Sequence, residues 1–537
     1  MLGTMMDFPL TVTTILERAG KYFSAVEIVS RRPDRSLYRS SYGQVYRRAR
    51  ALGECLQRAG MKRGDRVATL MWNHSAHLET YYGVPVAGGV AHTLNLRLHP
   101  DDLAYIVNHA EDRFLIVDDV LLPLYEKFRD RVKIERVVVV PQSGKPVPAG
   151  YENYEDFLAQ ATGEFSYPAL GENEAAAMCY TSGTTGKPKG VLYSHRALVL
   201  HSFCIALADC FGLAQRDVLL AVVPMFHANA WGLPFAAAMI GGKLVLPGPH
   251  LDAESLLELF ERERVTYAAG VPTVWLGILE ALEKDPGHWK LFPGLRMTCG
   301  GAAAPEGMIR RFDKLGPKII HSWGMTEMTP AGTTSYIKST LENWPEDKKY
   351  ELRAKQGLPL PFVELRGMTM EREIPWDGKT LGELQVRGPW IAESYYNQPE
   401  EKERWTADGW FRTGDVVTID EEGYIKIADR SKDLIKSGGE WISSVDLENA
   451  LMSHPAVQEA AVIAVPHPKW QERPLACVVL KKDAKASDEE LREFLGQKFA
   501  KWQIPDAVVF VESIPRTSVG KFLKSKLREQ FHAWKWE

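Results

Sequence analysis

Apolar residues recur at helical spacing in six stretches of the chain, which predicts amphipathic helices. These stretches are residues 10–23, 42–59, 77–86, 194–211, 274–282 and 305–315. Short apolar runs of strand length lie between them, at residues 66–71, 114–117, 137–140, 218–223, 244–246, 267–269 and 319–320. Strands that alternate with helices predict parallel sheets with helices on both faces. Residues 144–171 are rich in Gly, Pro and acidic residues and are expected to form a loop.

The pattern changes after Gly357, where apolar and polar residues alternate with period two. The alternating runs are residues 363–366, 382–387, 416–419 and 425–427. This alternation is typical of antiparallel strands that bury one face. We therefore expect an antiparallel sheet or a distorted β-barrel in this part of the chain.

The last hundred or so residues have the pattern of a separate α+β unit. Strands are expected at residues 457–465, 475–480 and 507–511, and helices at residues 487–502 and 521–531. The last helix carries a basic patch of Lys521, Lys524, Lys526 and Arg528, which we interpret as a solvated helix face. The whole pattern predicts an α/β protein. A large N-terminal domain, residues 1–430, contains layered α/β subdomains and a distorted β-barrel, and a small α+β C-terminal domain, residues 431–537, follows it.

Composition excludes several classes of protein. At 537 residues the chain is too long for one compact domain, and a net charge of −4 gives no general case for nucleic-acid binding. Six scattered cysteines without a C-x-x-C pair argue against a disulfide framework or a zinc site and for a reducing compartment. The N-terminus has no secretory signal and no apolar run reaches about 18 residues. We therefore expect a cytoplasmic protein without a transmembrane segment.

Residues 180–190, YTSGTTGKPKG, are the strongest candidate for a binding loop. They combine glycines, hydroxyl side chains and two lysines directly after the apolar run 175–179. Glycines let a backbone approach a ligand closely, and hydroxyls with backbone N–H groups bind phosphate oxygens. The spacing differs from the common P-loop, because only two residues separate Gly183 from Gly186 and a proline follows Lys187. The alternative, a flexible surface turn, fits the density of hydroxyls and lysines less well.

Five motifs in order resemble those of the adenylate-forming (AMP-forming) acyl-CoA synthetases. They are residues 180–190, 321–327 (HSWGMTE), 409–415 (GWFRTGD), 429–436 (DRSKDLIK) and 515–521 (PRTSVGK). The resemblance covers essentially the whole chain and is closest to the medium- and long-chain fatty acyl-CoA synthetases, including a branch that acts on short methylthioalkanoates. It implies ATP, Mg²⁺ and CoA. A carboxylic acid would form an acyl-adenylate with release of pyrophosphate, and CoA would then displace AMP to give acyl-CoA.

The resemblance implies a nucleotide site formed by four of these motifs together with Gly301. The ATP-binding candidates are Thr181, Ser182, Gly183, Thr184, Thr185, Gly186, Lys189, Gly301, His321, Ser322, Trp323, Thr326, Asp415, Arg430, Lys432 and Lys436. Trp323 replaces a tyrosine that is more usual in the superfamily, and either ring can stack on adenine. Asp415 would accept hydrogen bonds from the ribose hydroxyls with Arg430 assisting. Glu327 would be a catalytic Mg²⁺ ligand with Thr184 as a second contact, because Mg²⁺ takes few protein ligands beside phosphate oxygens.

Lys521 is the catalytic lysine that the resemblance implies, and it would neutralise charge where the carboxylate meets the α-phosphate. Because Lys521 lies in the small C-terminal domain, that domain must be mobile. Lys432 occupies the family's hinge position. Gly438, Gly439, Glu440 and Trp441 would line the path of CoA, although two adjacent glycines are equally typical of a simple turn.

The acyl-site candidates follow the apolar run 218–223. They are His227, Ala228 and Trp231. His227 could meet the carboxylate, as a catalytic residue, and the resemblance implies that Trp231 gates an acyl tunnel. A structural histidine and a plain core tryptophan are the alternatives. The sequence does not define the length of the tunnel.

Three other functions remain open at this point. The first is a ligase for another small carboxylate, such as a methylthioalkanoate or an aryl acid. The second is a non-catalytic nucleotide- or acyl-binding homologue, which the presence of Lys521, Glu327 and Asp415 disfavours. The third is a P-loop kinase or ATPase, which the loop spacing disfavours. By analogy with related fatty acyl enzymes we expect a homodimer, and the absence of a transmembrane segment leaves room for peripheral membrane contact.

Overall fold

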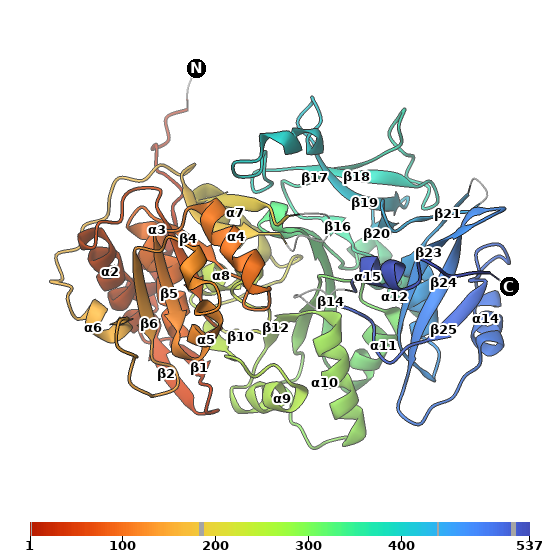
Figure 1. The fold of residues 1–537 in the computed structure, drawn as a ribbon, viewed down its shortest axis with the longest axis horizontal. Coiled ribbons are helices and arrows are strands. Elements are labelled where there is room, and N and C mark those ends of the chain that lie inside the picture. Colours follow the sequence, from red (N-terminus) through yellow and green to blue (C-terminus); the bar gives the residue numbers. More distant parts are fainter. Residues whose placement is uncertain (2, 182–186, 438–439, 517–521, 537) are drawn as a thin grey trace.

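The computed structural model describes the chain except residues 2, 182–186, 438–439, 517–521 and 537 (Figure 1). Its strands form four sheets. The first sheet and its helices lie at one end of the molecule and the C-terminal strands lie at the other, with the second sheet between them (Figure 1). This confirms a mixed α/β protein with a large N-terminal part and a smaller C-terminal part.

The first sheet has seven strands in the order β7-β6-β5-β3-β4-β8-β9. They are β3 (Arg66–Leu70), β4 (Val90–Thr93), β5 (Phe114–Asp118), β6 (Arg136–Val140), β7 (Glu152–Asn153), β8 (Ala175–Tyr180) and β9 (Gly190–Ser194). All neighbours are parallel except β8 and β9, which pair antiparallel. The helices of this region are α1 (Val12–Tyr22), α2 (Tyr42–Arg58), α3 (Ser75–Val86), α4 (Pro100–Ala110), α5 (Leu122–Tyr125), α6 (Tyr154–Leu158) and α7 (His195–Ala206).

The second sheet has nine strands in the order β16-β15-β14-β13-β12-β10-β11-β1-β2. They are β1 (Glu27–Arg31), β2 (Leu37–Ser41), β10 (Val218–Ala221), β11 (Lys243–Leu246), β12 (Tyr267–Gly270), β13 (Arg296–Cys299), β14 (Lys318–Gly324), β15 (Ala331–Thr334) and β16 (Leu358–Pro359). Its helices are α8 (Leu233–Ile240), α9 (Ala253–Arg262), α10 (Pro272–Lys284), α11 (Glu306–Leu315) and α12 (Glu346–Ala354). Strands β10 to β14 pair in parallel, as the alternation of apolar runs and helices predicts.

The third and fourth sheets contain the rest of the chain. The third is antiparallel and consists of β17 (Glu364–Met368), β18 (Gly382–Arg387), β19 (Phe411–Ile419) and β20 (Ile425–Arg430) in that order. The fourth consists of β21 (Ile435–Ser437), β22 (Glu440–Ile442), β23 (Val457–His467), β24 (Gln471–Leu480) and β25 (Ala507–Phe510). Helices α13 (Ser444–Met452), α14 (Asp488–Gly496) and α15 (Lys524–Gln530) accompany the fourth sheet.

Several predicted elements differ from the structure. Of the two expectations for the chain after Gly357, an antiparallel sheet or a distorted β-barrel, the third sheet fits the first, with β17 and β20 at its two edges. The predicted loop 144–171 contains α6, because Asn153 caps the helix by accepting from Glu155 N–H and Tyr154, Phe157 and Leu158 are buried. The helices predicted at 194–211 and 487–502 end early, at Ala206 and Gly496. Phe522 and Leu523 precede the last helix, which begins at Lys524.

The basic patch on the last helix is also not a purely solvated face. The Lys524 side chain is only 9% exposed, whereas Lys526 is exposed as predicted. The six cysteines are free and buried. Among the described residues no helix is both long enough and apolar enough to cross a bilayer.

Asn73, between β3 and α3, joins the first two sheets. Its Nδ2 donates to the carbonyls of Ala221 and Val223, at 2.9 Å each, and its Oδ1 accepts from Met225 N–H at 2.7 Å. The Tyr81 hydroxyl on α3 donates to the Met225 carbonyl. A fully buried amide that meets three backbone groups fixes their position, since an unpaired buried polar group is costly. The first sheet therefore holds the segment that follows β10 on the second sheet.

Candidate active site

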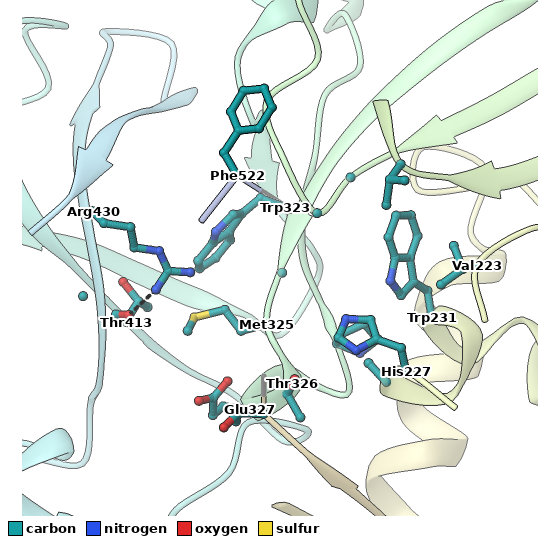
Figure 2. Close-up of a pocket in the computed structure, with 18 of the residues that line it drawn as sticks. Val223, His227, Trp231, Trp323, Met325, Thr326, Glu327, Thr413, Arg430 and Phe522 are labelled. Atoms are coloured by element: carbon teal, nitrogen blue, oxygen red, sulfur yellow. Dashed lines mark hydrogen bonds between the residues drawn. The ribbon is translucent and has the colours of Figure 1, made fainter. Parts of the chain in front are cut away.

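A cavity of about 650 Å³ lies where the first three sheets and the C-terminal segment meet. The predicted site residues that line it are Thr181, Lys189, His227, Ala228, Trp231, Gly301, Ser322, Trp323, Thr326, Glu327, Arg430 and Lys432. Arg430 lies on one side of this cavity, and His227 and Trp231 lie on the other (Figure 2). Residues that are far apart in the sequence thus form one site.

A second cavity of about 260 Å³ adjoins the first and shares Trp323 and Arg430 with it. Asp415 and His321 also line this second cavity. Both ring nitrogens of His321 are bonded, because Nε2 accepts from Ala304 N–H at 3.2 Å and Nδ1 lies 3.0 Å from the Ala354 carbonyl. Burial lowers the pKa of His321 to about 4, so its ring is neutral. The ring therefore fixes the backbone beside the cavity.

Asp415 and Arg430 are paired across two neighbouring strands. They face each other in the register of β19 and β20, and Arg430 Nε lies 2.6 Å from Asp415 Oδ1. The Trp323 indole donates from Nε1 to the other oxygen, Oδ2, at 2.9 Å. Sequence reasoning predicted all three residues but missed the indole bond, which a tyrosine at this position could not make through a ring N–H. Asp415 is thus a carboxylate of fixed orientation in the wall of the second cavity.

Glu327 is buried in the short helix η4 (Thr326–Met328) and reaches the larger cavity. The Tyr395 hydroxyl donates to Glu327 Oε1 at 2.6 Å, and the Tyr193 hydroxyl donates to the Thr326 carbonyl at 2.7 Å. Burial and the neighbouring Glu327 charge raise the pKa of Tyr395, so Tyr395 stays a hydrogen-bond donor. No sequence pattern indicated either tyrosine. A buried carboxylate at a cavity wall is a donor of the type that Mg²⁺ prefers.

The phosphate-loop candidate joins two antiparallel strands, in contrast to the strand and helix that a common P-loop joins. Thr181 and Lys189 close its base, because Thr181 N–H donates to the Lys189 carbonyl at 2.9 Å and Lys189 N–H donates to Thr181 Oγ1 at 3.1 Å. Lys189 Nζ lies 2.5 Å from Glu401 Oε2 and 5.1 Å from the centre of the Tyr395 ring. Five predicted residues lie outside the described chain: Ser182, Gly183, Thr184, Thr185 and Gly186.

Two of the acyl-site candidates, Ala228 and Trp231, lie on a left-handed turn, η3 (Ala228–Gly232), and His227 directly precedes it. Positive φ angles of 43 to 56° extend from Ala228 to Trp231, none of which is glycine. Left-handed non-glycine residues cost roughly 1–3 kcal/mol each and persist only where packing enforces them. The Trp231 indole is 8% exposed and packs against Gly300, where an added Cβ would approach it to 3.1 Å. The turn therefore places Trp231 in the wall of the cavity under strain.

The apolar side of the larger cavity lies beside this turn. Its lining side chains include Phe211, Val222, Val223, Leu251, Val271 and Val274. None of these side chains carries a charge or a hydrogen-bonding group. This side of the cavity is suited to a hydrocarbon group.

The predicted hinge and CoA candidates surround β21 and β22. Lys432 lines the larger cavity, whereas Lys436 is exposed with its Nζ 4.8 Å from the centre of the Trp441 ring. Trp441 is 41% exposed. Gly438, Gly439, the side chain of Glu440 and Lys521 lie outside the described part of the structure. Phe522 and Leu523, which directly follow Lys521, line the larger cavity.

A buried polar cluster beside the cavities was not predicted. Lys524 Nζ lies 2.6 Å from Glu448 Oε1 and donates to Ser444 Oγ. Ser444 N–H in turn donates to Asp429 Oδ2 at 2.9 Å. Burial raises the pKa of Glu448 to about 7, and it also raises that of Asp429. In this conformation the cluster joins α13 and α15 to the end of β20.

Comparison with known proteins identifies the family. Residues 17–396 match the family model of the AMP-binding enzymes, and residues 446–521 match the model of the AMP-binding enzyme C-terminal domain. The chain belongs to the AMP-binding enzyme family.

Two relatives and two solved structures show how similar this chain is to known CoA ligases and related enzymes. The chain is 53% identical to a long-chain-fatty-acid–CoA ligase of Thermus thermophilus (98% of this chain, 97% of the relative). It is 48% identical to a 3-methylmercaptopropionyl-CoA ligase of Ruegeria pomeroyi (99% of each chain). The anthranilate CoA ligase AuaEII in complex with anthranoyl-AMP has a TM-score of 0.87 at 27% identity (98% of each chain). ATP-bound MatB from Rhodopseudomonas palustris has a TM-score of 0.82 at 26% identity (98% of this chain, 100% of MatB).

Proposed function

We propose that this protein is an AMP-forming CoA ligase that activates medium- or long-chain fatty acids. ATP and the acid would give an acyl-adenylate and pyrophosphate, and CoA would then give acyl-CoA and AMP. One observation carries the proposal: a single cavity joins the base of the phosphate loop, Glu327, Arg430 and an apolar wall beside Trp231. The relatives that act on fatty acids support the same activity.

The nucleotide would span the two cavities. Trp323 would stack on adenine, and Asp415 would accept from the ribose hydroxyls while it keeps its bonds to Trp323 and Arg430. This is feasible because each carboxylate oxygen has two lone pairs. Thr181, Lys189 and the loop residues between them would hold the β- and γ-phosphates.

Glu327 would hold Mg²⁺ in the larger cavity, with Thr184 as the second contact. The ion supplies positive charge that offsets the charge of the phosphates. The Tyr395 hydroxyl would keep the Glu327 carboxylate oriented toward that position, because it already donates to Oε1.

Lys521 would act in the adenylation step only, and the C-terminal domain would turn about Lys432 before the thioester step. The position of Phe522 and Leu523 at the cavity supports this role for their neighbour. We place the domain boundary between residues 430 and 431, where β20 ends and four residues lead to β21. CoA would then approach along Gly438, Gly439, Glu440 and Trp441. We also propose a homodimer, by analogy with related fatty acyl enzymes, together with a cytoplasmic location and peripheral membrane contact.

A panel of carboxylic acids tests the proposed function. Acids from C3 to C18, with methylthiopropionate and benzoate, would be scored by CoA-dependent release of AMP. Because the wall beside Trp231 is apolar, we expect aliphatic acids of about eight carbons or more to have the highest kcat/KM. A preference for methylthiopropionate would favour the second candidate, a methylthioalkanoate ligase, which the Ruegeria relative supports. Formation of ADP in place of AMP would contradict both.

Replacing Trp231 with alanine should loosen the coupling between ATP and the fatty acid. The strained turn holds the indole in the cavity wall, so its removal should open the acyl side in the absence of nucleotide. Calorimetry would measure the fatty-acid Kd with and without a non-hydrolysable ATP analogue. We expect the ratio of these two Kd values to be about tenfold smaller in the variant than in the wild type. Trp376→Ala, at an exposed tryptophan, is the matched control. An unchanged nucleotide effect in Trp231→Ala would assign Trp231 to the core alone.

A further inference from the structure

Glu401 is a carboxylate in the phosphate-binding half of the larger cavity that the proposed reaction does not use. It lies in the short helix η6 (Pro399–Arg404), more than two hundred residues from the loop that it contacts. Its Oε2 is 2.5 Å from Lys189 Nζ, and their side chains are 28% and 17% exposed. Both side chains line the cavity. The lysine best placed for phosphate is thus already paired with an anion.

The surroundings of this pair fix its position. Lys189 is held at its backbone by two hydrogen bonds to Thr181 and at its ammonium by the face of the Tyr395 ring. Tyr396 N–H donates to the Gly190 carbonyl at 2.9 Å, so the chain that leads into η6 lies along the end of the loop. A phosphate group that accepts from the Lys189 ammonium in this position would therefore also lie close to Glu401.

The other charges that face this half of the cavity are mostly positive. Arg97, Lys187 and Arg404 line the larger cavity together with Lys189, and the carboxylates in its lining besides Glu401 are Glu327 and Asp433. Such a site favours a highly charged polyphosphate, and a site that binds its leaving group too tightly releases it slowly. A carboxylate beside the central lysine lowers the positive potential at that point.

We propose that Glu401 is a positioning residue that weakens the hold of Lys189 on inorganic pyrophosphate and so promotes its release. Glu401 competes with the phosphate oxygens for the Lys189 ammonium group. The ion pair between Glu401 and Lys189 forms again when pyrophosphate leaves. This rests on the proposed function in one respect, namely that Lys189 binds the β- and γ-phosphates.

Pyrophosphate binding tests the proposal without any carboxylic acid. Calorimetry with magnesium pyrophosphate should show that Glu401→Gln binds about three- to tenfold more tightly than the wild type, as expected for removing a partly buried competing charge. Glu401→Ala should shift the affinity in the same direction. AMP, which lacks the β- and γ-phosphates, should bind all three proteins with equal affinity, and this also shows that the variants are folded.

Two further variants separate the explanations. Glu400→Gln changes the neighbouring exposed carboxylate of the same helix and should alter pyrophosphate affinity less than twofold. In a Lys189→Ala background, Glu401→Gln should also have less than a twofold effect, because the competition acts through Lys189.

Three results would overturn the proposal. The first is an unchanged pyrophosphate affinity in Glu401→Gln, and the second is a weaker affinity together with a higher Mg²⁺ requirement, as expected for a metal ligand. The third is that Glu401→Gln changes pyrophosphate affinity equally in the wild-type and Lys189→Ala backgrounds. The acid panel can fail while these affinities behave as expected, so failure of the proposed function is distinguishable.

Discussion

Replacing Lys521 with alanine should abolish adenylation, while the conversion of a supplied acyl-adenylate to acyl-CoA should continue at nearly the wild-type rate. The lysine would stabilise charge only where the carboxylate attacks the α-phosphate, and the loss of one such group typically costs about 10²- to 10³-fold in rate. The proposed turn of the C-terminal domain would take this residue away from the reacting groups before CoA reacts, so the second step would not need it.

The two half-reactions can be measured separately. Pyrophosphate release with acid and ATP reports the first, and acyl-CoA formation from synthetic acyl-adenylate and CoA reports the second. Lys526→Ala, on the exposed side of α15, is the matched control and should leave both rates within about twofold. A similar loss in both half-reactions of Lys521→Ala would contradict a role restricted to adenylation.

Asp415→Asn should raise the KM for ATP by about 10- to 100-fold. The carboxylate accepts from Trp323 and Arg430 on its two oxygens, and an amide can present an acceptor to only one of them. Hydrogen bonds to a charged group are worth roughly 1.5–3 kcal/mol, so the loss of charge weakens both the fixed orientation and the expected ribose contacts.

The measurement for this variant is the affinity for ATP and for AMP, because both nucleotides carry the ribose. Both should weaken by the same factor. Asp408→Asn provides the control, since Asp408 also pairs with an arginine, Arg366, at 2.9 Å but lies at the surface. Its ATP affinity should stay within about twofold of the wild type. Weakened binding of ATP with unchanged binding of AMP would contradict a ribose role for Asp415.

Local patterns predicted most of the fold because they depend on burial along one segment. The run 66–71 coincides with β3 to within a residue, and the helix predicted at 42–59 is α2, Tyr42–Arg58. Helix ends were less predictable. The apolar pattern continues beyond Ala206, but Leu207 adopts an extended ψ of 147° and ends α7. Tertiary packing decides such ends, and it leaves no periodic signal in the sequence.

The candidate site was predictable only where motifs carried it. The motifs pointed to Glu327, Asp415 and Arg430, and each of these residues lines one or both of the cavities. They gave no indication of Tyr395 at Glu327, of Glu448 at Lys524 or of Glu401 at Lys189, because each partner lies in a distant segment without a motif. The burial of Lys524 shows the same limit, since a lysine on an amphipathic helix is usually solvated.

The three hydrogen bonds of Asn73 have a consequence for protein engineering. These bonds hold the backbone from Ala221 to Met225, which leads to His227. The position of this segment therefore depends on both the first and the second sheet. Because all three bonds are to backbone groups, a chimera that exchanges residues 218–232 between relatives would keep them as long as Asn73 is present. Replacing Asn73 itself would release this segment from the first sheet and leave buried backbone groups unpaired.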